Sequence, residues 1–102
     1  MDRELTMELL VTYDVDTTTP DGARRLRRVA KVCEAYGLRV QKSVFEIVCS
    51  DVDWMIMKKR LLDVIDGDQD SIRVYQMNAG ALGRAQHLGR SPEAPHGAPL
   101  IY

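Results

Sequence analysis

Hydrophobic and polar residues alternate most clearly near the N-terminus, over residues 8–16. Leu9, Val11 and Tyr13 occupy every second position, and the mixture of β-branched and aromatic side chains is typical of a mostly buried strand. The run ends abruptly at two carboxylates, Asp14 and Asp16. Because a sheet fixes the last residue of a strand while the next loop leaves it open to solvent, we expect Asp14 to be exposed there, in a position that suits a functional group.

The next periodic segment predicts an amphipathic helix. Thr19 is available as its N-cap, and Pro20 suits the first helical position. Gly37 is expected to end the helix as its C′ residue. The apolar residues of the helix follow a spacing of three and four, at Leu26, Val29, Ala30, Cys33 and Tyr36.

Residues 38–50 are rich in Val, Ile and Phe, and this stretch is long for a single strand. We interpret it as two strands, Leu38–Gln41 and Ser43–Cys49, which are broken near Lys42.

A second helix is indicated by Ser50 and Asp51, which are candidates for its N-cap. Its apolar residues predict one broad stripe, while three basic residues at positions 58–60 face outward. Residues 66–70, which are mostly acidic, predict a turn and not a calcium-binding loop, because they lack the bidentate Glu of such a loop. Residues 71–77 predict the last strand. The members of the stripe are Val52, Trp54, Met55, Ile56, Met57, Leu61, Leu62 and Ile65.

The order strand, helix, strand, strand, helix, strand is the ferredoxin-like βαββαβ sandwich of the α+β class. We expect this domain over residues 1–78 and a C-terminal tail over residues 79–102. The tail ends in three apolar residues after Pro99, which predicts that Pro99–Tyr102 docks as an extra edge strand on a neighbouring subunit. Because this topology serves small-molecule regulators, metal chaperones, RNA binders and nucleases, the fold alone does not decide the function.

The composition is that of an ordinary globular protein of one domain, with 102 residues, 45% hydrophobic and 28% charged. No stretch approaches the roughly 18 apolar residues of a membrane span, and the N-terminus lacks the pattern of a secretory signal. We therefore expect a cytoplasmic protein without a membrane partner. Cys33 and Cys49 lie in apolar patterns without a second ligand nearby, which favours buried free thiols over a disulfide or a zinc site.

Positive charge is concentrated in residues 21–45, although the whole chain has a net charge of −1. This segment could form an anion-binding face, or it could be a solvated helix surface, and charge alone does not decide between the two. It carries two acidic residues and seven basic ones, Arg24, Arg25, Arg27, Arg28, Lys31, Arg39 and Lys42.

Three motifs, in this order and spacing, resemble the Cas2 family, the smaller of the two CRISPR adaptation proteins. They are the strand Leu10–Val15 with Tyr-Asp-Val at its end, Arg39–Glu46 after an arginine-rich helix, and Asp70–Tyr75. The resemblance covers residues 7–78. It implies a homodimer with a metal site at its two-fold axis, and a role in antiviral defence and spacer acquisition. It also implies either a Mg²⁺-dependent endonuclease acting on RNA or DNA, or a scaffold between dimers of the Cas1 family integrase.

The family's residues can be carried over to this sequence by position. The metal-binding, catalytic aspartate falls on Asp14, the strand arginine on Arg39 and the aromatic residue on Phe45. Ser43 also matches the motif and is expected to support the site, as is Tyr13. The helix arginines fall on Arg24 or Arg25 and on Arg27. Because the loop at 16–22 is longer than in the shortest family members, the assignment among Arg24, Arg25, Arg27 and Arg28 stays open. Lys31 lies on the same face of the helix.

The physical chemistry of these residues is consistent with a magnesium site that two chains share. Mg²⁺ prefers oxygen ligands and is usually held by one or two carboxylates, so a single Asp14 is a poor site, whereas two copies across a dimer axis make a plausible one. Asp16 is either an auxiliary ligand or a loop cap, and we favour the cap. Tyr13 and Phe45 are interpreted as core or interface residues rather than base-stacking platforms. Arg39 is a second ambiguous residue, since it could instead pair with Glu46 or Asp14.

Three functions therefore remain open from the sequence. The first is a metal-dependent phosphodiesterase, for which no general base is visible near Asp14, since His87 and His96 lie in the tail. The second is an architectural adaptor whose arginine face holds nucleic acid by its phosphates and whose tail binds the integrase. The third is a ferredoxin-like regulator that binds a small ligand.

Overall fold

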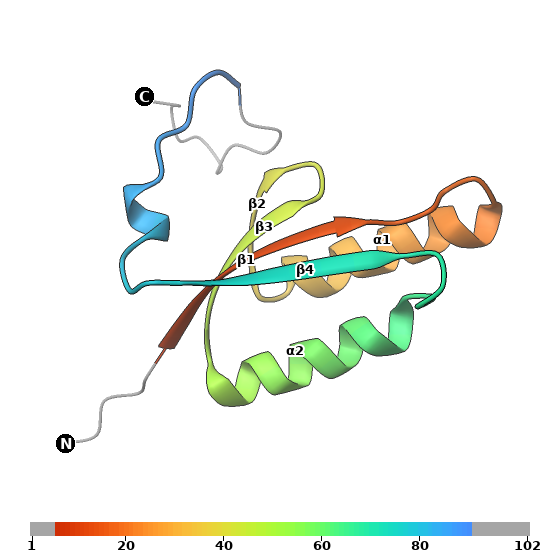
Figure 1. Cartoon of the computed structure of the whole chain (residues 1–102), viewed down its shortest axis with the longest axis horizontal. Helices are drawn as coiled ribbons and strands as arrows, with labels where there is room; N and C mark the ends of the chain where they lie inside the picture. The colour runs from red at the N-terminus through yellow and green to blue at the C-terminus, as the bar shows by residue number, and fades with distance from the viewer. Residues whose placement is uncertain (1–5, 91–102) are drawn as a thin grey trace.

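The computed structural model describes residues 6–90, in which two α-helices pack against a four-stranded sheet (Figure 1). The order of the six main elements confirms the predicted ferredoxin-like βαββαβ arrangement. In chain order the elements are β1 (Thr6–Asp14), α1 (Pro20–Glu34), β2 (Gly37–Gln41), β3 (Val44–Ser50), α2 (Asp51–Val64), β4 (Ser71–Met77) and a short 3-10 helix, η1 (Leu82–Arg84).

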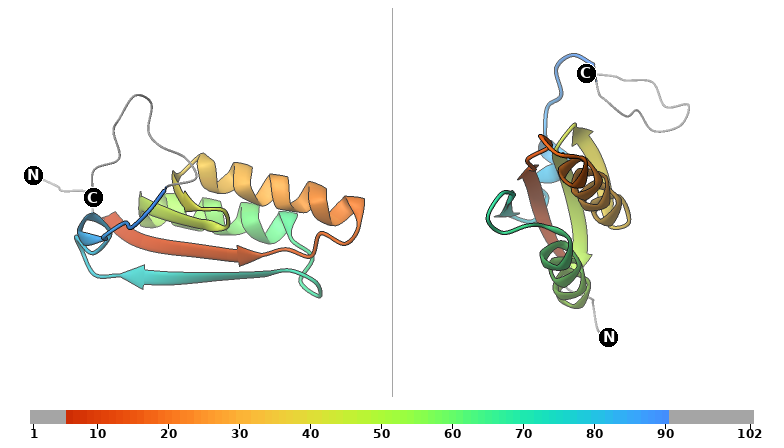
Figure 2. Two further views of the ribbon diagram at one scale, coloured as in Figure 1. Left: turned by 90° about the horizontal axis from the view of Figure 1, so that it is seen from above. Right: turned by 90° about the vertical axis from the view of Figure 1, so that its right-hand side faces the viewer.

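The sheet has the strand order β2-β3-β1-β4, and all neighbouring strands are antiparallel. β1 lies in the interior of the sheet, where Val11 is opposite Phe45 of β3 and Val74 of β4. Both helices lie on one side of the sheet (Figure 2). No α-helix within residues 6–90 covers the other side, which we call the open face.

The core lies between this sheet and the two helices. Leu9, Val11 and Tyr13 are at most 6% exposed, which confirms the alternation seen in the sequence. Cys33 and Cys49 are buried free thiols, as predicted, and burial raises the pKa of both, that of Cys33 to about 12. The other strands and the helices complete the core with Phe45, Ile47, Val29, Met57 and Leu61.

The starts of both helices also follow the sequence prediction. The side chain of Thr19 accepts a hydrogen bond from the Gly22 amide at 3.1 Å, and α1 begins at Pro20. The side chain of Ser50 accepts one from the Asp53 amide, also at 3.1 Å, which caps α2. Each cap satisfies a backbone N–H group that has no partner inside the helix.

The predicted role of Gly37 as the C′ residue of α1 is wrong. α1 ends at Glu34, and Gly37 is the first residue of β2, without a positive φ. A Cβ atom at this position would collide with the backbone oxygen of Glu46 and with Cδ1 of Ile47 on β3. Glycine is therefore required here for the close approach of two strands rather than for a left-handed turn.

The single broad apolar stripe predicted for α2 is also wrong. Met57 and Leu61 are buried, whereas Val52, Met55 and Leu62 are 65%, 69% and 61% exposed. The helix therefore has apolar residues on two faces, because the sheet and α1 cover only part of its circumference.

After β4, the start of the predicted tail is attached to β1. The carboxylate of Glu8 accepts hydrogen bonds from the backbone amides of Gly80 at 2.6 Å and Leu82 at 3.0 Å. These two bonds hold the pKa of Glu8 below its usual range. The predicted docking segment Pro99–Tyr102 lies outside the described residues.

Among residues 6–90, none of the helices has the length and apolar character needed to cross a membrane.

The crowding around Gly37 gives a stability prediction. We expect Gly37→Ala to lower the free energy of unfolding by about 1–3 kcal/mol, because β2 must move away from β3 to make room for the methyl group. Gly67→Ala is the matched control, since its Cβ would have no neighbour within 4 Å and its φ is not positive. Urea unfolding at neutral pH measures both variants, and equal stabilities would contradict the prediction.

Candidate functional site

Asp14 is the last residue of β1, opposite Ser71 of β4. It alternates with buried Tyr13, so it belongs to the open face, together with Leu10 and Thr12. Its side chain is exposed and has no hydrogen bond or ion pair with any of residues 6–90. The carboxylate is therefore available to a ligand, as the sequence predicted for the end of this strand.

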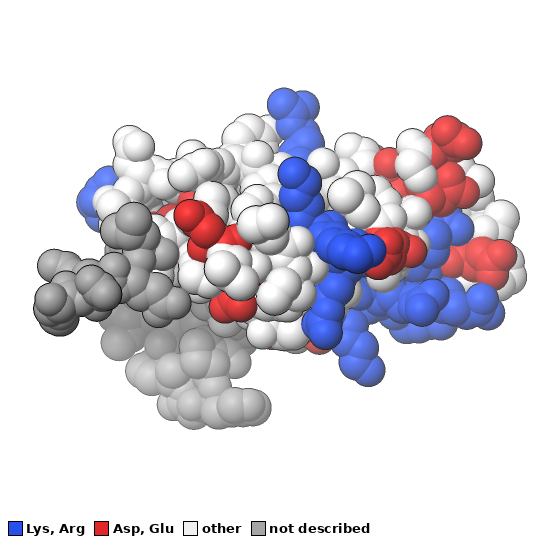
Figure 3. All heavy atoms as spheres, turned by 90° about the horizontal axis from the view of Figure 1, so that it is seen from below, with Lys and Arg blue, Asp and Glu red and all other residues white. Residues whose placement is uncertain are grey.

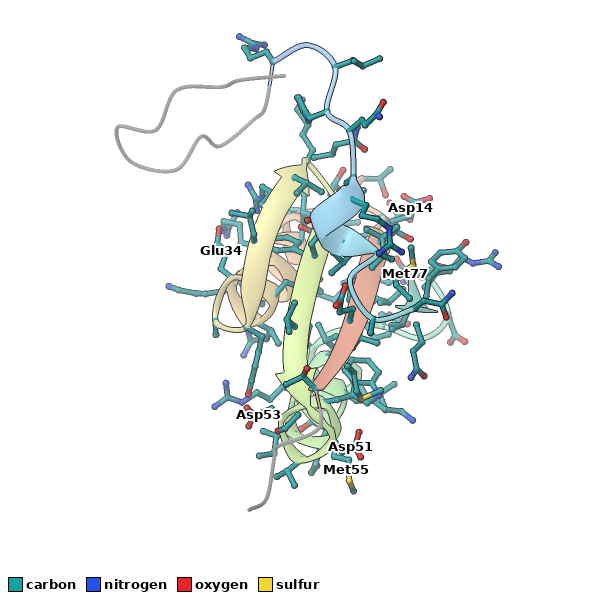
Figure 4. The ribbon with its side chains drawn as sticks, turned by 90° about the vertical axis from the view of Figure 1, so that its left-hand side faces the viewer. Asp14, Glu34, Asp51, Asp53, Met55 and Met77 are labelled. Atoms are coloured by element: carbon teal, nitrogen blue, oxygen red, sulfur yellow. The ribbon has the colours of Figure 1, made fainter. Side chains whose placement is uncertain are left out.

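One chain does not assemble a complete metal site around Asp14. Within residues 6–90, no group of three His, Cys, Asp or Glu residues is placed to hold an ion. The acidic residues Glu34, Asp51 and Asp53 lie far from Asp14 in other parts of the fold (Figure 4). Since Mg²⁺ is usually held by one or two carboxylates with water and phosphate, a single Asp14 is a poor site alone, and a second carboxylate would have to come from another chain.

Asp16 is engaged within its own loop, which confirms its interpretation as a cap. Its Oδ1 atom accepts hydrogen bonds from the Thr18 amide at 2.9 Å and from the Thr18 hydroxyl at 2.7 Å. These bonds hold the pKa of Asp16 below its ordinary value. Asp16 therefore shapes the turn between β1 and α1.

The turn between β2 and β3 is attached to the end of β1, next to Asp14. The Tyr13 amide donates to the Ser43 carbonyl oxygen at 3.0 Å, and the Tyr13 hydroxyl donates to the Lys42 carbonyl oxygen at 3.3 Å. Ser43 thus contacts the strand through its backbone, and it helps to fix the residue that precedes Asp14.

The two predicted aromatic residues are buried below the site, on the helix side of the sheet. The rings of Tyr13 and Phe45 stack with their centres 6.2 Å apart, which confirms that they are core residues. The guanidinium of Arg39 lies 5.3 Å from the centre of the Phe45 ring. Arg39 pairs with Glu34 at 3.6 Å, and not with Glu46 or Asp14. The sheet therefore separates Arg39 from Asp14.

The arginines of α1 fall into two groups. Arg24 forms an exposed pair with Asp21 at 2.9 Å. Arg27, Arg28 and Lys31 are exposed and form no ion pair with any of residues 6–90. Arg25 is different, since its side chain is only 15% exposed and is bound inside the protein.

Arg25 binds Asp70, the last residue of the predicted turn and the first residue of the Asp70–Tyr75 motif. The Arg25 guanidinium donates to both carboxylate oxygens of Asp70, at 2.7 and 3.2 Å. The same carboxylate accepts the backbone amides of Asp66 at 2.9 Å and Asp16 at 3.2 Å. Asp70 is the residue that joins α1, the loop after β1 and the turn before β4. The Asp70–Tyr75 motif singled it out from the other residues of that turn, but no pattern in the sequence predicted that it is buried and paired with Arg25.

Comparison with known proteins gives one consistent result. The family model described as CRISPR associated protein Cas2 matches residues 7–85. The chain is 47% identical to the CRISPR-associated endoribonuclease Cas2 3 of Rhodospirillum rubrum, over 91% of this chain and 98% of that protein. It is 40% identical to the CRISPR-associated endonuclease Cas2 of Halalkalibacterium halodurans, over 94% of this chain and 100% of that protein. The crystal structure of Streptococcus pyogenes Cas2 at pH 6.5 is 48% identical, covers 81% of this chain and 100% of its own, and has a TM-score of 0.74.

The two neighbouring arginines of α1 provide a matched stability test. We expect Arg25→Met to lower the free energy of unfolding by about 3 kcal/mol, because it leaves the Asp70 carboxylate buried without its cation. Arg24→Met removes an ion pair whose partners are 60% and 74% exposed, and should cost at most about 0.5 kcal/mol. Urea unfolding at neutral pH compares the two, and similar losses would show that the Asp70 contacts contribute little.

The same ion pair predicts an acid-sensitive part of the stability. The hydrogen bonds from Arg25, followed by those from the Asp66 and Asp16 amides, lower the pKa of Asp70 in the folded protein. Its contribution to stability is therefore complete above the ordinary aspartate pKa and is lost as pH falls through the lowered value. We expect the free energy of unfolding to fall more steeply below about pH 4 in the wild type than in Asp70→Asn. Parallel slopes for the two proteins would contradict this assignment.

Proposed function

The chain belongs to the CRISPR associated Cas2 family, and from this premise we propose that it is a dimeric, Mg²⁺-dependent endonuclease of CRISPR adaptation, cleaving RNA or DNA. The observation that carries the proposal is the position of Asp14, which is exposed at the end of β1 on the open face and has no partner among residues 6–90. The endoribonuclease and endonuclease names of the relatives, at 47% and 40% identity, support the same activity.

The open face supports the proposed homodimer. It exposes apolar side chains from three strands, with Leu38 49%, Val48 56% and Tyr75 44% exposed. Packing this face against that of a second copy would bury these side chains around a two-fold axis. The two copies of Asp14 could then face a common ion, which would meet the need for a second ligand that one chain leaves unmet.

The residues divide the proposed chemistry between them. Asp14 and its symmetry mate would hold Mg²⁺, which activates water and neutralises charge on the phosphodiester when it is bound. Arg24 and Arg27 of α1 are proposed to bind backbone phosphates without reading the sequence. Arg25 and Arg39 are buried or half-buried in ion pairs, so we propose that they support the site from inside, together with Tyr13, Ser43 and Phe45. Arg28 and Lys31 line a groove with α2 and are considered below.

The second candidate function is a non-catalytic scaffold that holds DNA between dimers of a Cas1 family integrase during spacer acquisition. It is favoured because, within the described residues, no hydrogen bond or ion pair joins Asp14 to a His, Asp or Glu that could act as a general base. In both candidates we propose that residues 1–78 form the domain and that the tail docks on the dimer or on the integrase. The Glu8 carboxylate supports this proposal, since it fixes the point at which the tail leaves β4.

Cleavage by two aspartate variants separates the candidates. We expect Asp14→Asn to abolish Mg²⁺-dependent cleavage of labelled RNA and duplex DNA, because it removes the proposed ligand without changing the size of the side chain. Asp16→Asn is the control, since an asparagine can keep the Thr18 cap, and it should retain cleavage.

Nucleic-acid binding and spacer integration are measured beside cleavage. Asp14→Asn should bind duplex DNA as the wild type does. Arg27→Glu should weaken binding and reduce the slope of log K against log salt concentration by about one, the value for one lost phosphate contact. If neither the wild type nor Asp14→Asn cleaves, while both support integration with the Cas1 partner, the enzyme proposal fails and the scaffold stands. If the protein binds no nucleic acid, both candidates fail.

A further inference from the structure

The outer side of α2 carries apolar residues that the fold does not use. Met55 and Leu62 are 69% and 61% exposed, and Val52 beside them is 65% exposed. Met55 lies on the side of α2 away from the sheet and points outward (Figure 4). Single exposed apolar residues are ordinary, but three on one helix form a patch of the kind that marks a protein contact.

Two hollows lie side by side along this part of α2. Met55 and Leu62 line a shallow one of about 360 Å³, together with Lys58, Lys59 and Asp63. The second is a groove of about 490 Å³ between α1 and α2, and the two hollows adjoin at Asp63, which lines both. The groove has an apolar floor and a charged rim, formed by Val32, Ala35 and Val64 and by Arg28, Lys31, Arg60 and Asp63.

The charges around these hollows are unbalanced. Asp63 is the one carboxylate of both linings, and it is paired with Lys59 at 3.4 Å. Arg28, Lys31 and Arg60 form no ion pair with any of residues 6–90. Basic side chains accordingly form a band across this face, next to uncharged ones (Figure 3).

We propose that the outer α2 surface, defined by Met55, Leu62, Arg60, Arg28 and Lys31, docks an acidic amphipathic helix of a partner protein. The apolar pair would contact the hydrophobic side of that helix, and the three cations would meet Asp and Glu residues beside it. Met55 and Leu62 are seven residues apart, about 10.5 Å along α2, which matches apolar residues at positions i and i+7 of a second helix.

The apolar pair favours a protein over nucleic acid as the occupant. A phosphate backbone would satisfy the cations, but it would leave Met55 and Leu62 exposed to water. The docking surface is also on the helix side of the molecule, whereas Asp14 belongs to the open face. A partner could therefore bind here without blocking the proposed dimer, and this inference requires neither metal binding nor cleavage.

Two synthetic helical peptides with the same leucine spacing test the proposal, one with Glu and the other with Lys at its remaining positions. With the full-length protein labelled for NMR, the Glu peptide should shift the amide signals of residues 28–35 and 55–64, and the Lys peptide should not. Arg60→Glu and Met55→Gln should each weaken binding of the Glu peptide by about tenfold. Lys42→Glu makes the same charge change at an exposed residue of the β2–β3 turn and should have no effect.

A charge exchange provides the sharpest outcome. The double variant with Lys31→Glu and Arg60→Glu should no longer bind the Glu peptide and should bind the Lys peptide. It should still fold, since the fold does not depend on either side chain. The proposal is overturned if the wild type binds both peptides equally, or if the shifts lie outside these segments. It is also overturned if duplex DNA, anionic lipid vesicles or self-association shift these amides while the Glu peptide does not. Loss of cleavage or of DNA binding in Asp14 or Arg27 variants would leave it unchanged, so the two proposals fail independently.

Discussion

The buried carboxylate of Asp70 is the interaction on which the functional end of the molecule depends. A charge without access to water is stable in a protein only when it is paired and hydrogen-bonded, and here the Arg25 guanidinium and two backbone amides meet that need. Each donor comes from a different segment, so satisfying one carboxylate fixes the loop after β1, the start of α1 and the turn before β4 relative to one another. Asp14 and the first cations of α1 belong to these segments, and their positions follow from this constraint.

The sheet sorts the remaining residues by its two faces. The side chains of Tyr13, Phe45 and Arg39 are on the helix side, where they stack and are covered, whereas the neighbouring Asp14 is on the open face. Residues that are close in the family motif are therefore separated by a layer of backbone, and only one of them can meet a ligand on the open face. The others contribute by holding the strand end and the β2–β3 turn in place.

The uncovered surfaces suggest how such a small protein can serve several partners at once. The open face carries the carboxylate and an apolar patch, α1 carries exposed cations, and α2 carries apolar and basic groups together. Because the open face and the helix side of the sheet point in different directions, a second copy on the open face and a protein helix on α2 would not compete for the same side chains. Their separation is consistent with a role in an assembly, whether or not the carboxylates also catalyse cleavage.

Local patterns in the sequence determined the strands, both helix caps, the buried alternation of β1 and the exposed position of Asp14, because each depends on neighbours along the chain. Only the tertiary structure decided the roles of Gly37, Asp70 and the two faces of α2. Gly37 faces a strand that approaches closely, Asp70 receives an arginine 45 residues away, and α2 is covered on one side only. Periodicity can show that a residue is apolar or charged, but burial and pairing depend on which distant segment lies opposite, and that information exists only in the folded chain.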